Sequence, residues 1–300
     1  MNKKCFSTLL AMLAITTLLV SATTVTAHIP DDIPEPNSTM RELSYKSEIA
    51  FSPEDTKDVS LGEPGTSFSY VETFGFSQAA YFDDTSHLNF PVGLAVDQTD
   101  NVYIFEESGK RMLKYDSSGV FQYKIGVAGL EDSNDYNFSN PQDGVIDLNN
   151  NIWVAESHRV VAYNSTGGVL LQIPEIDAWQ SGTENGRFNH TTGVAFDSLG
   201  RLYVSDCNNQ RIQIFEFDTE GNPVWIHMLG ETEVSGNDNF HFKYPERIAI
   251  QNDLLFVADS ENHRIQVFDV SNSDPTLFAY LTTIGTSGDP GNDNDHLDSP

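Results

Sequence analysis

Basic residues and cysteine are both scarce in this sequence. Its 300 residues include 16 Lys+Arg against 44 Asp+Glu, which gives a formal net charge of −28 at pH 7. Nucleic-acid phosphates and anionic lipids bind clustered lysine and arginine, so this balance excludes a nucleic-acid-binding protein and argues against membrane docking by charge. The two cysteines, Cys5 and Cys207, are too few for a disulfide scaffold or for a four-cysteine zinc module of the RING type.

The first 27 residues have the pattern of an export signal. Lys3 and Lys4 precede a mostly apolar stretch at residues 6–20, and small residues lead to a cleavage point after Ala27. The apolar stretch is short for a membrane span, so we interpret residues 1–27 as a cleaved signal peptide rather than as an uncleaved anchor. This interpretation predicts a secreted or cell-surface protein.

Two regions follow the predicted signal peptide. Residues 28–67 are rich in proline and acids and show little periodicity, which predicts an extended acidic linker or arm. Residues 68–300 contain a sequence repeat whose four units begin at Phe90, Asn140, His190 and Tyr244. The matching positions Pro91, Pro141, Thr191 and Pro245 are 50, 50 and 54 residues apart. Self-similarity at such a pitch indicates a repeat architecture.

Each unit contains four short segments rich in β-branched and aromatic residues, separated by Asn, Asp and Gly turns. Helical periodicity is absent from these units, so the predicted fold class is all-β. Four antiparallel strands in about fifty residues correspond to one blade of a β-propeller. The sequence therefore predicts a propeller with four blades plus one extra strand at Ser69–Phe74.

The repeat motif is P-x-G-[LV]-A-[VF]-D, followed by [NR]-[VL]-Y-[IV]-x-[DE] and N-x-R-I-Q-[IV]-F. It resembles the NHL repeat, most closely at Leu202–Phe215 and Leu255–Phe268. Members of that family are commonly six-bladed, so the resemblance implies six blades in the full protein. The chain would then be an incomplete propeller, truncated at its C-terminus. A four-bladed closure with a spare strand is the alternative.

An acid ends the second strand of every unit and an arginine opens the third. The acids are Glu106, Glu156, Asp206 and Asp259, and the arginines are Arg111, Arg159, Arg211 and Arg264. The two positions flank one hairpin, so we expect charge-assisted hydrogen bonds between them and a structural role for the arginines. In the alternative interpretation the four acids, with His87 and His241, form a ligand-binding face, because each second strand ends where a first strand begins.

The loops between units are long and acidic, which favours a cation or a basic partner on that face. Two of them contain GNDNF and GDPGNDND, whose carboxylates are the hard oxygen ligands that Ca²⁺ prefers. Asp238, Asp293 and Asp295 are therefore candidate calcium ligands, although the spacing of an EF-hand is missing. Calcium is the one cofactor that the sequence suggests.

The function predicted from these features is binding without catalysis. The peptidyl-hydroxyglycine lyases resemble this fold and bind zinc through a histidine after the repeat's proline. The matching positions here are Val92, Gln142, Thr192 and Glu246. None of them is a histidine, so we do not expect that lyase activity from these units. We expect an exported scaffold that binds a protein, glycan or cationic ligand through an acidic face, with neither nucleic-acid binding nor RING-type ubiquitin machinery. The alternative is a metal-dependent hydrolase or lyase with its site at the central channel.

Overall fold

The computed structural model describes residues 76–77, 85, 87–128, 137–175, 180–291, 293 and 295–300. The predicted signal peptide, the predicted arm and the predicted strand at Ser69–Phe74 lie outside these residues. The described part consists of strands and short 3₁₀ turns, so the all-β prediction is confirmed. Among the described residues, no helix has the length and apolar character needed to cross a membrane.

Four sheets of four antiparallel strands follow one another along the chain, and each is a propeller blade. Blade 1 contains β3 (Pro91–Val96), β4 (Val102–Glu106), β5 (Arg111–Tyr115) and β6 (Phe121–Ile125). Blade 2 contains β7 (Pro141–Ile146), β8 (Ile152–Glu156), β9 (Arg159–Tyr163) and β10 (Val169–Ile173). Blade 3 contains β11 (Thr191–Phe196), β12 (Leu202–Asp206), β13 (Arg211–Phe217) and β14 (Pro223–Gly230). Blade 4 contains β15 (Pro245–Gln251), β16 (Leu254–Asp259), β17 (Arg264–Asp269) and β18 (Ala279–Ile284).

Short elements accompany the blades. Three 3₁₀ turns, η2 (Cys207–Asn209), η3 (Ser260–Asn262) and η4 (Pro275–Leu277), belong to blades 3 and 4. Ahead of blade 1, β1 (Phe76–Ser77) pairs in parallel with β2 (His87–Leu88). The sequence did not predict this parallel pair.

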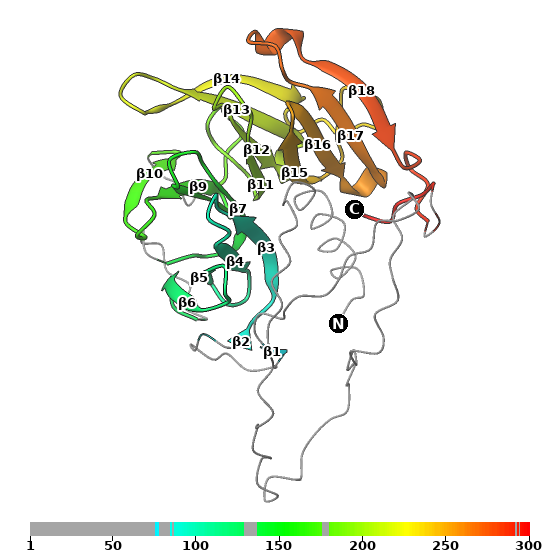
Figure 1. The fold of residues 1–300 in the computed structure, drawn as a ribbon. Helices are drawn as coiled ribbons and strands as arrows, with labels where there is room; N and C mark the ends of the chain where they lie inside the picture. The colour runs from blue at the N-terminus through cyan, green and yellow to red at the C-terminus, as the bar shows by residue number, and fades with distance from the viewer. Residues whose placement is uncertain are drawn as a thin grey trace, which may run out of the picture. The chain divides into compact units, whose positions relative to one another are not determined.

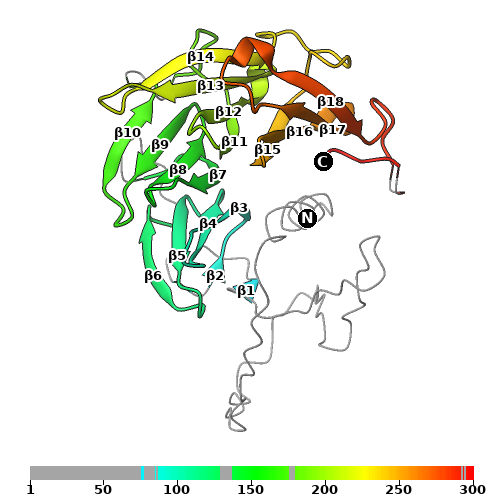
Figure 2. The same ribbon diagram turned by 45° about the horizontal axis from the view of Figure 1, so that its top comes forward.

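The blades stand side by side with their first strands innermost. The inner strands β3, β7, β11 and β15 contact one another in chain order, and the fourth strand of each blade is outermost (Figures 1 and 2). Because the strands alternate in direction, the loops that enter each blade lie at the same end as the turns between its second and third strands. We call this end the loop face, and the opposite end, which carries the turns between first and second strands, the turn face.

Apolar side chains fill the space between neighbouring blades. Each of three buried clusters draws its members from two successive blades. Glycine lets the blades approach closely, since a Cβ on Gly144 would lie 2.2 Å from Cζ of Phe105, a fully buried ring of blade 1. Burial of such a ring stabilises the fold by about 1.5–3 kcal/mol. The packing of one blade against the next therefore gives the loop face a firm support.

Candidate functional site

The acid of each second strand is buried beneath the loop face. Glu106, Glu156, Asp206 and Asp259 have no exposed surface and face Arg111, Arg159, Arg211 and Arg264, which are almost completely buried. In blades 3 and 4 the arginine Nε donates to the carboxylate over 2.8 Å. In blade 2 Arg159 Nη2 lies 2.9 Å from Glu156 Oε2, and in blade 1 Arg111 Nε bonds Glu106. These carboxylates are out of reach of a ligand on the surface, so their placement does not support a ligand-binding face.

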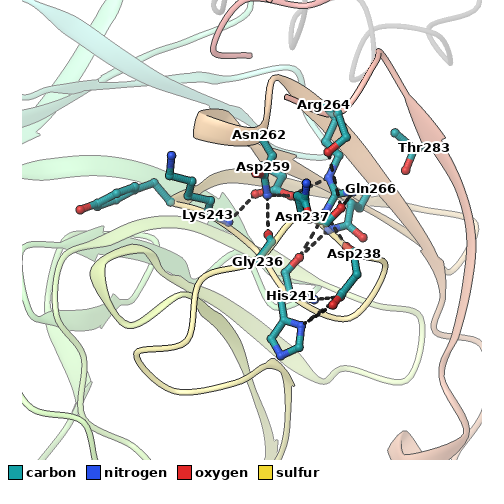
Figure 3. Close-up of polar contacts among 12 residues, drawn as sticks. Gly236, Asn237, Asp238, His241, Lys243, Asp259, Asn262, Arg264, Gln266 and Thr283 are labelled. Carbon is teal, nitrogen blue, oxygen red and sulfur yellow. Dashed lines mark hydrogen bonds and ion pairs between the residues drawn. The ribbon is translucent and has the colours of Figure 1, made fainter. Parts of the chain in front are cut away.

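The acid and arginine instead hold the loop that enters their own blade. In blade 4, Asp259 Oδ1 accepts a hydrogen bond from the backbone N–H of Lys243 over 2.6 Å (Figure 3). Arg264 donates through Nη1 to the carbonyl of Asn237 over 2.8 Å and through Nη2 to the carbonyl of Asp238 over 2.6 Å. Arg264 Nη2 also donates to the carbonyl of His241 over 3.2 Å, so one buried ion pair fixes the loop at four backbone positions.

Two further side chains complete this loop clamp in blade 4. Asn262 Nδ2 donates to the carbonyl of Gly236 over 2.7 Å, and Gln266 Nε2 donates to the carbonyl of His241 over 2.9 Å (Figure 3). Both amides also bond the buried carboxylate of Asp259, at 2.9 and 3.1 Å. The loop clamp therefore consists of Asp259, Asn262, Arg264 and Gln266, and it binds backbone atoms only.

Blade 3 repeats the arrangement with Asp206, Asn209, Arg211 and Gln213. Asn209 Nδ2 bonds the carbonyl of Gly182 over 2.7 Å, and Gln213 Nε2 bonds the carbonyl of Arg187 over 2.7 Å. The part that the asparagine and the glutamine play in holding the loop was not predicted from the sequence. Their signal was present as D-x-x-N-x-R-x-Q, which occurs in both units.

The loop held by the blade 4 clamp presents an exposed aromatic ring. Asp238 Oδ1 accepts from the backbone N–H of Phe240 over 2.8 Å and of His241 over 3.0 Å. These bonds close a tight turn whose tip is Phe240, with 76 % of its surface exposed. Glu231, Glu233 and Asp238 are exposed residues of the same loop. The result is an exposed apolar ring on an acidic loop whose backbone is held in place.

His241 lies between two of these carboxylates. Its Nδ1 is 2.9 Å from Asp238 Oδ1, and its Nε2 is 3.4 Å from Glu231 Oε2. The hydrogen bond to Asp238 is the main cause that raises the pKa of His241, with a smaller contribution from Glu231. This side chain therefore fastens the loop and is partly exposed. His87, the other histidine assigned to a binding face, has a carbonyl that accepts from Arg111 Nη2 over 2.7 Å.

The predicted calcium ligands belong to two separate turns of the same design. Asp293 Oδ1 accepts from the backbone N–H of Asp295 over 2.9 Å and lies 2.6 Å from His296 Nδ1. Asp238 and Asp293 are thus each engaged by a histidine three residues later. Across the described part of the chain, no group of three or more His, Cys, Asp or Glu side chains could hold a metal ion. The placement of Asp238, Asp293 and Asp295 does not support a shared calcium site.

The thiol of Cys207 is poorly placed to act as a nucleophile or a metal ligand. Cys207 is buried, and burial raises the pKa of its thiol to about 12. The thiolate needed for nucleophilic attack or metal binding is therefore scarce at neutral pH.

Comparison with known proteins agrees with the repeat. The NHL repeat family matches residues 188–215 and 242–268. NHL repeat-containing protein 3 of Mus musculus is 27% identical over 162 residues, which are 48% of this chain and 45% of that protein. The human protein of the same name is 27% identical over 150 residues, 46% of this chain and 41% of its own length. The chain thus spans less than half the length of these relatives.

Solved structures with similar coordinates have low sequence identity. A streptogramin B lyase aligns with a TM-score of 0.46 and 15% identity, covering 71% of this chain and 58% of that one. A gluconolactonase from Xanthomonas campestris aligns with a TM-score of 0.45 and 18% identity, covering 66% of this chain and 63% of that one. These likenesses carry no argument about activity.

Proposed function

We propose that this β-propeller, which carries NHL repeats at residues 188–215 and 242–268 and has a fold suited to a scaffold or binding role, binds a lysine- or arginine-rich protein segment through its loop face. The observation that carries the proposal is the exposed ring of Phe240 on a loop held at its backbone by Asp259, Asn262, Arg264 and Gln266.

Chemistry favours a basic segment as the partner. An aromatic face attracts lysine and arginine side chains, and carboxylates around it add to that attraction. Glu231, Glu233 and Asp238 supply exposed carboxylates in the same loop as Phe240. The net charge of −28 also speeds the approach of a cationic partner. A loop whose backbone is held before binding loses little backbone freedom on association, which favours affinity.

We also propose that the protein is exported, as residues 1–27 suggest. The test is N-terminal sequencing of protein recovered outside the cells that express the full chain. A mature N-terminus at His28 is expected, and a protein that keeps Met1 inside the cell would contradict export.

The binding test uses a fluorescein-labelled peptide of twelve alternating lysine and glycine residues as its probe, with fluorescence anisotropy as the readout. Phe240→Ser is expected to weaken binding about tenfold, equivalent to about 1.4 kcal/mol. Raising the salt concentration should weaken binding of the unmodified protein.

A matched control distinguishes binding at Phe240 from nonspecific binding to exposed apolar side chains. Leu148 is 84 % exposed and lies in a turn of blade 2 on the turn face. Leu148→Ser removes a comparable exposed apolar group and should leave the anisotropy curve unchanged. Equal losses in both variants, or no binding by the unmodified protein, would contradict the proposal.

A further inference from the structure

The inner strands carry charges at one level of the propeller. Along β3, β7, β11 and β15 the one basic residue is Arg247, and the acids are Asp143 and Glu246. A Cβ on Gly93 would lie 3.2 Å from Asp143 Oδ1, so this carboxylate lies against the inner strand of blade 1. Asp143 and Arg247 are both partly exposed.

Arg247 reaches from blade 4 to two other blades. Its Nη1 donates to the carbonyl of Thr192 in blade 3, and its Nη2 donates to the carbonyl of Val92 in blade 1 over 3.2 Å. A guanidinium has five N–H donors. Three of those donors therefore have no partner among the residues that the structure describes.

Arg247, which is partly exposed, differs from the buried arginines in its ion pairing. Arg201 also bonds carbonyls of a neighbouring segment, at Val270 over 2.6 Å and at Asn272 over 2.8 Å. Its Nε, however, is 2.5 Å from Asp197 Oδ2. The arginines that open the third strands are each paired with a carboxylate in the same way: Arg111, Arg159, Arg211 and Arg264. The charge of Arg247 lowers the pKa of Asp143 and of Glu246, but no carboxylate of the described residues forms an ion pair with it.

Asp143 lies beside Arg247 along the same edge of β11. Its Oδ2 accepts from the backbone N–H of Val194 over 3.5 Å, while Arg247 bonds the carbonyl of Thr192. These two backbone groups belong to residues two positions apart on one strand. The guanidinium and the carboxylate are therefore neighbours on the inner strands.

Asp143 is also short of partners. Burial is the main cause that raises its pKa, to about 6, although the charge of Arg247 and the backbone N–H of Gly144 lower it. The carboxylate thus keeps room to accept a further hydrogen bond. A donor from outside the chain would relieve part of the cost of its burial.

We propose that Arg247 and Asp143 form a binding site for a small hydroxycarboxylate. The ligand's carboxylate takes the unfilled N–H donors of Arg247, whose planar fork matches two oxygens at once. The ligand's hydroxyl donates to Asp143. The site lies on the inner strands and does not depend on the binding of a basic segment at Phe240.

The test measures binding of glycolate, a carboxylate with a neighbouring hydroxyl, and of acetate, which lacks the hydroxyl, by isothermal titration calorimetry at constant ionic strength. Glycolate is expected to bind at least about tenfold more tightly than acetate. Arg247→Gln should weaken both at least about tenfold, and Arg247→Lys should weaken both by less. Asp143→Asn should reduce the preference for glycolate to less than about threefold while acetate binds no worse.

Lys243→Gln is the matched control. Lys243 is an exposed basic residue of the same blade whose Nζ lies 3.7 Å from Glu261, and its loss should leave glycolate affinity unchanged. Thermal melting identifies any variant that fails to fold. If Arg247→Gln is unfolded, the glycolate affinity of Arg247→Lys tests the role of this position.

Three outcomes would overturn the proposal. The first is the absence of glycolate binding to the unmodified protein, which would leave Arg247 as a brace between blades. The second is equal glycolate affinity before and after Arg247→Gln in a folded variant. The third is tight phosphate binding that Asp143→Asn does not affect, which would indicate a site for any anion without a place for a hydroxyl.

Discussion

The carboxyl of Asp143 makes the stability of the propeller depend on pH. Its pKa rises from 3.8 to about 6 in the folded chain because burial disfavours the charged form. Between these values the folded state binds more protons than the unfolded state, so stability decreases as pH rises from about 4 to about 6. The neutral form is favoured below this window, and the folded chain carries the cost of the buried charge above it.

The size of the effect follows from the shift. A difference of 2.2, from 3.8 to about 6, corresponds to about 3 kcal/mol at 1.36 kcal/mol for each pKa unit. Asp143→Asn replaces the carboxyl with a neutral group of the same shape. The variant is therefore expected to exceed the parent in free energy of unfolding by up to about 3 kcal/mol at pH 8, and by close to nothing at pH 4.

Urea denaturation at pH 4, 5, 6, 7 and 8, without added carboxylate, measures this difference. Asp269→Asn is the control, because Asp269 is partly exposed and its hydrogen bonds to Ser271 lower its pKa. That variant should not gain stability at pH 8. A difference between Asp143→Asn and the parent that stays constant with pH, or that grows toward pH 4, would refute the reasoning.

Three other predictions concern the core, the loop clamp and the thiol. Gly144→Ala places a Cβ against the buried ring of Phe105 and should lower the free energy of unfolding by about 1–3 kcal/mol in urea denaturation; an unchanged midpoint would show that the ring moves freely. Arg264→Met leaves Asp259 buried without its cation and should cost about 3–5 kcal/mol in the same assay, whereas a cost below about 1 kcal/mol would contradict a buried pair. Cys207 should resist iodoacetamide at pH 8 until urea unfolds the protein, as site-resolved mass spectrometry can show, and rapid labelling of the folded chain would contradict its raised pKa.

The blades were predictable because their signals are local. Each strand is a short run rich in β-branched and aromatic or other apolar residues between turns, as at Phe121–Ile125 and Val169–Ile173. The acid and arginine of a unit flank one hairpin, so their proximity follows from the strand register. In blade 4 the register pairs Asp259 with Arg264 directly.

The candidate site was less predictable, because its contacts join distant segments through backbone atoms. Asn262 and Gln266 bond backbone carbonyls about 25 residues earlier. Every residue has such a carbonyl, so the sequence does not mark which one is bonded. Arg247 and Val92 are 155 residues apart in the sequence. They meet because both lie on the innermost strands of their blades. The sequence also gave no sign that the acids of the second strands would be fully buried.

The way the entering loops are held affects how binding specificity could diversify. The amides and guanidinium of blade 4 take carbonyl oxygens at Gly236, Asn237 and Asp238, so they hold the loop without using the side chain of Phe240. Side chains at the tip, such as Phe240, are therefore interchangeable without loss of the anchorage below. Blades 3 and 4 each provide such a platform, so new recognition surfaces could be grafted there one loop at a time.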